Sequence, residues 1–174
     1  AELVRTLKLP GQLEGCVADD ILGHLYIGEE ESGIWKFDAD PSESKEGVLI
    51  DTIGPHIAAD VEGLTLYYAS ETDGYLIASS QGDDTYTIYS RGDINNFIGR
   101  FSVVDSETID GTSSTDGIDV CNMGLGGKLS DGIFIVQDDV NDVGNQNFKI
   151  ISWGEIASIF NPPLEINSGY NLRN

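Results

Sequence analysis

The sequence predicts an all-β fold made of β-propeller blades: about three four-stranded antiparallel blades, with one short helix near the C-terminus. The main observation is a motif that occurs three times, opening at Glu14-Gly15, Glu62-Gly63 and Asp116-Gly117. The openings follow one another at intervals of about 50 residues, a period that suits a four-stranded blade. Turns rich in glycine and aspartate separate short apolar runs that have little helical periodicity, and this pattern favours strands.

The first two units each contain two apolar runs that follow the acidic-glycine opening. In the first unit these runs are Leu25–Ile27 and Ile34–Phe37, with the polar cluster Glu29–Glu31 between them. In the second unit they are Tyr75–Ala78 and Tyr86–Tyr89. Short apolar runs bounded by turn residues are typical of strands.

The third unit has the same pattern, with apolar runs at Ile133–Val136 and Phe148–Ile151. The segment Trp153 to Phe160 is the one predicted helix, and Asn161-Pro162-Pro163 ends it because proline cannot continue a helix. The strands expected along the chain are 3–9, 12–18, 24–29, 33–38, 48–53, 60–69, 74–80, 85–90, 97–104, 115–122, 132–137 and 147–152.

One domain is the expectation for a chain of 174 residues, with a partial propeller over residues 1–160 and a polar, loosely held tail over 161–174. Known propellers close with about four to eight blades, because closure protects the sheet edges. Three blades would leave edges and apolar surface in water. We therefore expect another chain, a second copy of this chain or an N-terminal half to complete the ring.

The charge balance excludes some classes of partner. Nine basic and 30 acidic residues give a net charge of −21, so nucleic acids and anionic membrane surfaces are poor partners. No stretch approaches the roughly 20 apolar residues that a membrane-spanning helix needs. The acids can make the surface soluble or hold divalent cations, and both interpretations can be true together.

The two cysteines, Cys16 and Cys121, each lie shortly after an acidic-glycine opening, in the first and third units. The inner strands of blades that are not neighbours are too far apart for a disulfide bond. We therefore expect two buried free thiols.

The repeated acids predict a site on the propeller axis, because the innermost strand of each blade lines the central channel. One ring is expected from Glu14, Glu62 and Asp116, and a second from Glu30, Gln81 and Asp138. Carboxylates held this close repel one another, so such a site is expected to hold protons or cations. Oxygen ligands without a His or Cys cluster select Ca²⁺ over zinc or copper.

Other interpretations of these acids remain open. The run Asp110–Asp119 has acids at alternate positions but lacks the terminal glutamate of an EF-hand, and Gln137–Asn147 is similarly rich in oxygen ligands. Either run can be an ordinary Asp/Asn turn, as can the acidic-glycine pairs. The sequence has no G-x-S-x-G elbow, no glycine-rich phosphate loop with lysine and no H-E-x-x-H motif. A glycosidase with paired carboxylates remains conceivable.

Several motifs in the same order resemble those of the β-propeller phytases, over about Gln12 to Ile159. They are Leu13–Asp20, Leu25–Glu30, Ala59–Tyr68, Tyr75–Gly82, Asp110–Val120 and Asn145–Lys149. The resemblance implies a six-bladed, calcium-dependent phosphatase that removes phosphates from phytate (inositol hexakisphosphate). A water or hydroxide held between calcium ions would attack phosphorus. This chain would supply the C-terminal three blades.

The resemblance also implies roles for individual residues. Glu14, Glu30 and Glu62 would form the catalytic, metal-bridging core. The calcium ligands of the catalytic site would be Glu14, Glu30, Asp60, Glu62, Gln81 and Asp116. A structural calcium site would consist of Asp110, Asp138 and Asn141, with Val140 standing where the family can carry an acidic ligand.

The chain departs from the family by lacking the motifs of the N-terminal half and most of the basic residues that grip phosphate. Lys36 and Lys149 lie near the repeat loops, and we expect both side chains to be solvated on strand surfaces. The rival hypothesis is therefore a non-catalytic half-propeller that binds calcium or phosphorylated ligands. By resemblance, the substrate is an inositol phosphate, the partner is an N-terminal half-propeller or a second copy, and the location is secreted or periplasmic.

Overall fold

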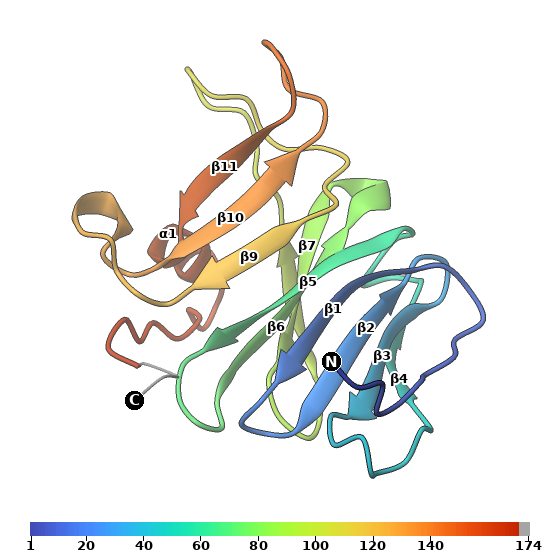
Figure 1. Cartoon of the computed structure of the whole chain (residues 1–174). Coiled ribbons are helices and arrows are strands. Elements are labelled where there is room, and N and C mark those ends of the chain that lie inside the picture. Colours follow the sequence, from blue (N-terminus) through green and yellow to red (C-terminus); the bar gives the residue numbers. More distant parts are fainter. Residues whose placement is uncertain (171–174) are drawn as a thin grey trace.

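Three antiparallel sheets stand side by side in the computed structural model, which describes residues 1–170 (Figure 1). The first sheet contains β1 (Leu13–Asp19), β2 (His24–Glu29), β3 (Gly33–Asp38) and β4 (Val48–Thr52). The second contains β5 (Val61–Tyr68), β6 (Gly74–Ser80), β7 (Thr85–Ser90) and β8 (Phe97–Phe101). The third contains β9 (Ile118–Cys121), β10 (Ile133–Asp138) and β11 (Asn147–Ser152).

The strands of each sheet pair in chain order, as they do in a propeller blade, so the predicted all-β class is confirmed. Two short 3-10 helices, Gln81–Asp83 and Gly127–Leu129, lie in connections. The arrangement of the sheets is consistent with propeller blades. The third sheet differs from the expected four strands, because it has three in the described part of the chain.

The predicted strand 3–9 is wrong: within residues 1–170 this segment is not paired with any sheet. Leu3 and Val4 are largely exposed, at 83% and 68%. The segment is held by Arg5, whose guanidinium donates hydrogen bonds to the backbone carbonyls of Asp38 (2.8 Å) and Asp40 (3.0 Å). Alternating apolar residues make a strand only where the backbone finds a neighbour to pair with.

The second sheet is covered on both faces and carries most of the core. β6 is buried along its whole length, and its side chains alternate between the two faces as a strand requires. Leu76 and Ala78 pack in the cluster that the second sheet shares with the first. Tyr75 and Ile77 pack in the larger cluster that it shares with the third sheet and the helix. The two contacts hold the three sheets as one unit.

The predicted helix is present as α1 (Trp153–Ser158), two residues shorter than expected. Ser152 caps its N-terminus, because the hydroxyl accepts a hydrogen bond from the backbone N–H of Glu155 at 3.4 Å. Trp153 is fully buried and stacks on Tyr67 with the ring centroids 4.2 Å apart. The helix therefore closes one end of the larger core. Among residues 1–170, no helix is long and apolar enough to cross a membrane.

The tail after the helix is fixed to the sheets, so the expectation of a loosely held segment is wrong for its described part. Leu164 is buried in the larger core. The hydroxyl of Tyr75 accepts a hydrogen bond from the backbone N–H of Glu165 at 2.8 Å, and that of Tyr67 accepts one from Asn167 at 2.9 Å. Its last four residues, 171–174, lie outside the described part.

The two cysteines, Cys16 on β1 and Cys121 on β9, are free, as predicted, but both are exposed rather than buried. β1 and β9 are the first strands of the outer two sheets, and β1 is exposed over much of its length. Leu13, on the same strand as Cys16, is 41% exposed. The sequence pattern did not show that these strands border open surface.

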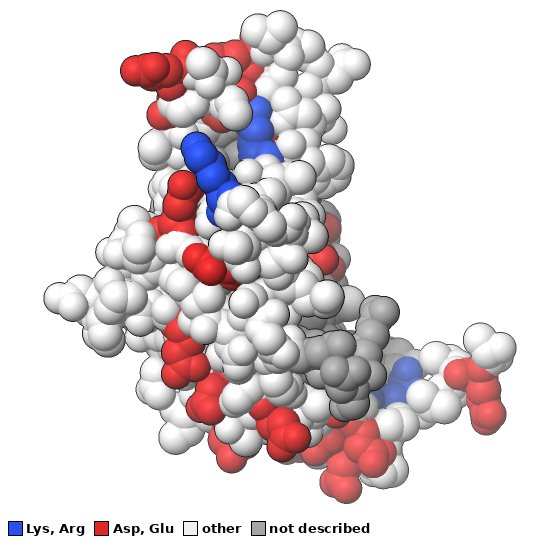
Figure 2. Space-filling model, turned by 90° about the vertical axis from the view of Figure 1, so that its left-hand side faces the viewer, with Lys and Arg blue, Asp and Glu red and all other residues white. Residues whose placement is uncertain are grey.

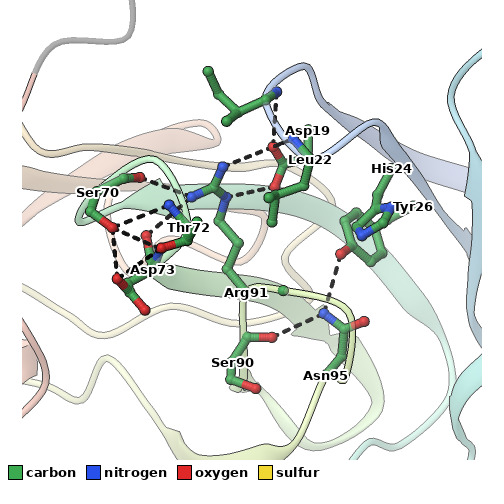
Figure 3. Close-up of polar contacts among 12 residues, drawn as sticks. Asp19, Leu22, His24, Tyr26, Ser70, Thr72, Asp73, Ser90, Arg91 and Asn95 are labelled. Carbon is green, nitrogen blue, oxygen red and sulfur yellow. Dashed lines mark hydrogen bonds and ion pairs between the residues drawn. The ribbon is translucent and has the colours of Figure 1, made fainter.

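A buried ion pair joins the first sheet to the second (Figure 3). Asp19 ends β1, and Arg91 directly follows β7. The guanidinium donates two hydrogen bonds to the Asp19 carboxylate, at 2.5 and 2.9 Å. It donates two more to the carbonyls of Ser70 and Asp73 in the β5–β6 turn, at 3.0 and 3.1 Å. One side chain thus fixes the end of β1, the turn and β7 together.

Candidate metal centre

The glycines of the repeated motif allow the inner strands β1, β5 and β9 to approach one another closely (Figure 1). A Cβ atom added at Gly15 would lie 2.4 Å from the carbonyl oxygen of Glu62, and one added at Gly63 would lie 2.7 Å from that of Asp116. The backbone N–H of Gly63 donates a hydrogen bond to Asp116 at 2.7 Å. Only glycine fits such contacts between backbones. The acids that precede the glycines are therefore brought together.

Three carboxylates meet where these strands begin. Oxygen atoms of Glu14, Glu30 and Glu62 all lie within 4.8 Å of one another. Glu14 is exposed, Glu30 is half-buried and Glu62 is buried. The structure thus brings together the three residues that the sequence predicted as the metal-bridging core.

Gln12 belongs to this site, although it is not among the residues predicted from the sequence. Its amide nitrogen donates hydrogen bonds to Glu14 at 2.8 Å and to Glu30 at 2.6 Å. The signal was present in the repeat, because Gln12 precedes Glu14 by two residues as Asp60 precedes Glu62. The backbone hydrogen bonds of the two units also correspond. The N–H of Glu30 donates to the carbonyl of Gln12 (3.1 Å), and the N–H of Gln81 donates to the carbonyl of Asp60 (3.0 Å).

The other three residues predicted as ligands of this site surround the core. The amide nitrogen of Gln81 donates a hydrogen bond to Asp116 at 2.9 Å. The backbone N–H of Asp116 donates to the side-chain oxygen of Gln137 at 2.8 Å. The negative charges of Asp60 and Asp116 both act on Glu62. All six predicted residues therefore lie in one electrostatic cluster.

Repulsion in this cluster is visible in the pKa of Glu62. Burial and, after it, the neighbouring charges of Glu14, Asp116, Glu30 and Asp60 together raise that pKa from 4.5 to about 7. The pKa of Glu30 is also raised, by desolvation and by its acidic neighbours. A divalent cation would remove this repulsion, and the all-oxygen donor set is of the kind that Ca²⁺ prefers. The residues present therefore fit a calcium ion.

Without a bound cation, the stability of the protein is expected to fall as the pH rises from about 5 to about 7. Between 4.5 and about 7 the folded state keeps the Glu62 proton that the unfolded chain releases, so a lower pH favours folding. Thermal melts across this range in a chelator check this dependence. Glu62→Gln should flatten it, whereas a melting temperature that rises with pH in this window would contradict the assignment.

Asp138 lies apart from Glu30 and Gln81, with which the repeat had grouped it. Glu30 and Gln81 directly follow their strands, whereas Asp138 is the last residue of β10. It corresponds to Glu29 and Ser80, the last residues of β2 and β6, and all three are buried. A shift of one residue along a strand moves a side chain to the other face of the sheet.

The second predicted calcium site converges on a lysine. Asp110, Asp138 and Asn141 lie close together, but the ammonium group of Lys149 is between them, 2.7 to 3.1 Å from an oxygen of each. A calcium ion and this ammonium group cannot occupy the same position. The residues present therefore do not fit a calcium ion at this site in the arrangement seen here.

The surface carries many acidic and few basic side chains. On the face that Figure 2 shows, Asp and Glu gather mainly towards the two ends of the molecule, and Lys and Arg occur at few places. This face has no continuous basic area of the kind that phosphate backbones require.

Comparison with known proteins gives one family and a relative. The model of the family described as Phytase matches residues 1–174. A 3-phytase of Bacillus subtilis (strain 168) is 49% identical over 175 residues, which cover 98% of this chain and 46% of that protein. The chain therefore spans about half the length of the relative that it matches.

Proposed function

The chain belongs to the phytase family, and we propose that it supplies the calcium-binding acids of an enzyme that releases phosphate from phytate. The enzyme would be a phosphoric monoester hydrolase, with inositol phosphates as its substrates. The observation that carries this proposal is the meeting of Glu14, Glu30 and Glu62 within 4.8 Å. A net charge of −21 would repel a polyphosphate, so this function needs a cation between protein and substrate.

In this proposal Glu14, Glu30 and Glu62 hold calcium, and Asp60, Gln81 and Asp116 complete the site. When bound, calcium would lower the pKa of a coordinated water and offset the charge of the phosphate. Glu62 must release its proton to act as a ligand, since its pKa is about 7. Gln12 holds the carboxylates of Glu14 and Glu30 towards each other through its two hydrogen bonds.

A second candidate is a non-catalytic half-propeller that binds calcium or phosphorylated ligands. It is favoured by the engagement of basic side chains elsewhere. Arg91, Arg100 and Lys149 pair with carboxylates, and Arg5 and Lys36 donate to backbone carbonyls. Few cations are then left in the described part of the chain to grip a phosphate.

Phosphate release from phytate by this chain in its completed ring, with calcium and with EGTA, tests the proposal. We expect release that needs calcium and that Glu62→Gln reduces at least about 100-fold, whereas Glu43→Gln, in an exposed loop, leaves it unchanged. Calcium binding without release would select the binding module. Release that survives both EGTA and Glu62→Gln would refute the calcium mechanism.

We also propose that an N-terminal half-propeller or a second copy of this chain completes the ring. Two copies would pair with two-fold symmetry. Light scattering tests the second copy, since a stable monomer would exclude it. A secreted or periplasmic location is proposed from the family resemblance, and fractionation of cells that make the protein tests it.

A further inference from the structure

Lys149 is a buried lysine at the centre of an oxygen cluster. Its side chain is 8% exposed, so the expectation that it is solvated on a strand surface is wrong. The ammonium nitrogen lies 2.7 Å from Oδ1 of Asp110, 2.9 Å from Oδ1 of Asn141 and 3.1 Å from Oδ2 of Asp138. These three are the residues that the family resemblance assigned to a structural calcium ion.

The strand β11 directs this side chain inward. Phe148 and Ile150, on either side of Lys149, are 69% and 57% exposed, and strand alternation turns Lys149 to the opposite, covered face. Lys149 lies opposite Val136 in the β10–β11 pair, two positions from Asp138 on the same face of β10. The position of the ammonium group thus follows from the register of the sheet.

The ammonium protons and carboxylate oxygens of the cluster have partners without a metal. An ammonium group has three protons, and three oxygens face this one. The second oxygen of Asp138 accepts from the backbone N–H of Ser113 at 3.0 Å, and that of Asp110 accepts from Asp142 at 2.9 Å. Within residues 1–170, the buried Oδ2 of Asp138 has no partner other than the ammonium group.

The cluster has one positive and two negative side chains. Two carboxylates, Asp110 and Asp138, face one ammonium group, and Val140, which stands where the family can carry an acid, is apolar and 67% exposed. The ammonium nitrogen lies 2.7 Å from Asp110 and 3.1 Å from Asp138, so it offsets part of their charge without a metal.

We propose that the ammonium group of Lys149 takes the place of a structural calcium ion, so that this cluster is complete without an external metal. The inference goes beyond the proposed function and does not depend on it. The two predicted calcium sites therefore differ. The chain supplies no cation to the site of Glu14, Glu30 and Glu62 in residues 1–170, whereas Lys149 supplies one to the other site.

Calcium titration by calorimetry in the full chain carrying Glu30→Gln and Glu62→Gln tests this proposal, because these changes silence the carboxylate site. We expect no calcium binding at submillimolar concentrations. One bound calcium that disappears on adding Asp138→Asn would overturn the proposal. This result does not depend on whether the Glu14, Glu30 and Glu62 site binds calcium or turns over phytate.

Lys149→Met in the same background tests whether calcium can replace the ammonium group. It is expected to lower the melting temperature by about 10 °C, because it leaves buried Asp138 without a counter-charge. Millimolar calcium should restore most of that loss, and Asp138→Asn should remove the restoration. Lys36→Met is the matched control, since Lys36 donates to carbonyls of Gly92 and Asp93 and to the side-chain oxygen of Asn95. Calcium should not rescue it, and equal rescue of both variants would contradict the proposal.

Discussion

Replacing Arg91 with methionine is expected to lower the melting temperature by about 10 °C. Removing one partner of a buried ion pair costs roughly 3–5 kcal/mol, because the remaining charge stays buried and unpaired. In a domain of this size each kcal/mol shifts the melting temperature by roughly 2–4 °C. Both side chains of the Arg91–Asp19 pair are fully buried.

The pKa of Asp19 supports this expectation. Burial acts to raise it, but the hydrogen bonds from Arg91 and from the N–H of Leu22 hold it below its ordinary value. The carboxylate is therefore charged at neutral pH, and Arg91→Met would leave it buried without its counter-charge. Thermal melts measured at neutral pH check the prediction.

Arg100→Met is the matched control for this substitution. Arg100 also pairs with a carboxylate, that of Asp83, at 2.7 Å. Both side chains of this pair are more than a third exposed, at 38% and 34%. Exposed pairs contribute roughly 0–1 kcal/mol, so a loss of less than about 3 °C is expected. Equal losses in the two variants would show that burial of the Arg91 pair does not matter.

Glu62→Gln is expected to weaken calcium binding by at least about 100-fold. Loss of a group that merely supports a metal ligand already costs roughly 10–100-fold, and this substitution removes the charge of a proposed ligand while keeping its shape. Calorimetric titration above pH 7, where Glu62 is ionised in the native protein, measures the change. The same variant should be more stable than the native protein in a chelator, because a repelled charge is gone.

These opposite effects separate a metal site from a simple acidic patch. Glu43→Gln changes the same chemical group in an exposed loop and should alter neither the calcium affinity nor the stability in a chelator. If Glu62→Gln stabilised the protein but left calcium affinity unchanged, calcium would bind elsewhere. If it changed neither the stability nor the calcium affinity, Glu62 would not carry the repelled charge that its raised pKa indicates.

The repeat in the sequence was sufficient to predict the sheets and the main acidic cluster. Its period gave the three units, and the acid before each glycine gave Glu14, Glu62 and Asp116 as neighbours. This worked because the repeated backbone contacts at Gly15 and Gly63 turn equal sequence positions into equal positions in space. The predicted strands 24–29, 33–38, 74–80, 85–90 and 147–152 match the structure residue for residue.

The sequence could not predict features that depend on which segment lies beside which. Segment 3–9 has a strand pattern but no partner strand in the described part of the chain, and Cys16 lies on a strand that borders open surface. Lys149 alternates like any strand residue, so its position among Asp110, Asp138 and Asn141 follows only from sheet register. Asp138 was misplaced because a one-residue offset in the third unit is invisible in an approximate repeat.

The glycine contacts also bear on how many carboxylates the acidic cluster contains. Each inner strand delivers one carboxylate from the position before its glycine, so each sheet that shares the hub adds at least one anionic ligand. In residues 1–170 no atom lies within 4 Å of a Cβ added at Gly117, the counterpart of Gly15 and Gly63. A further strand packed against Gly117 would bring one more side chain to the acidic cluster. Each added sheet would thus increase the number of possible cation ligands.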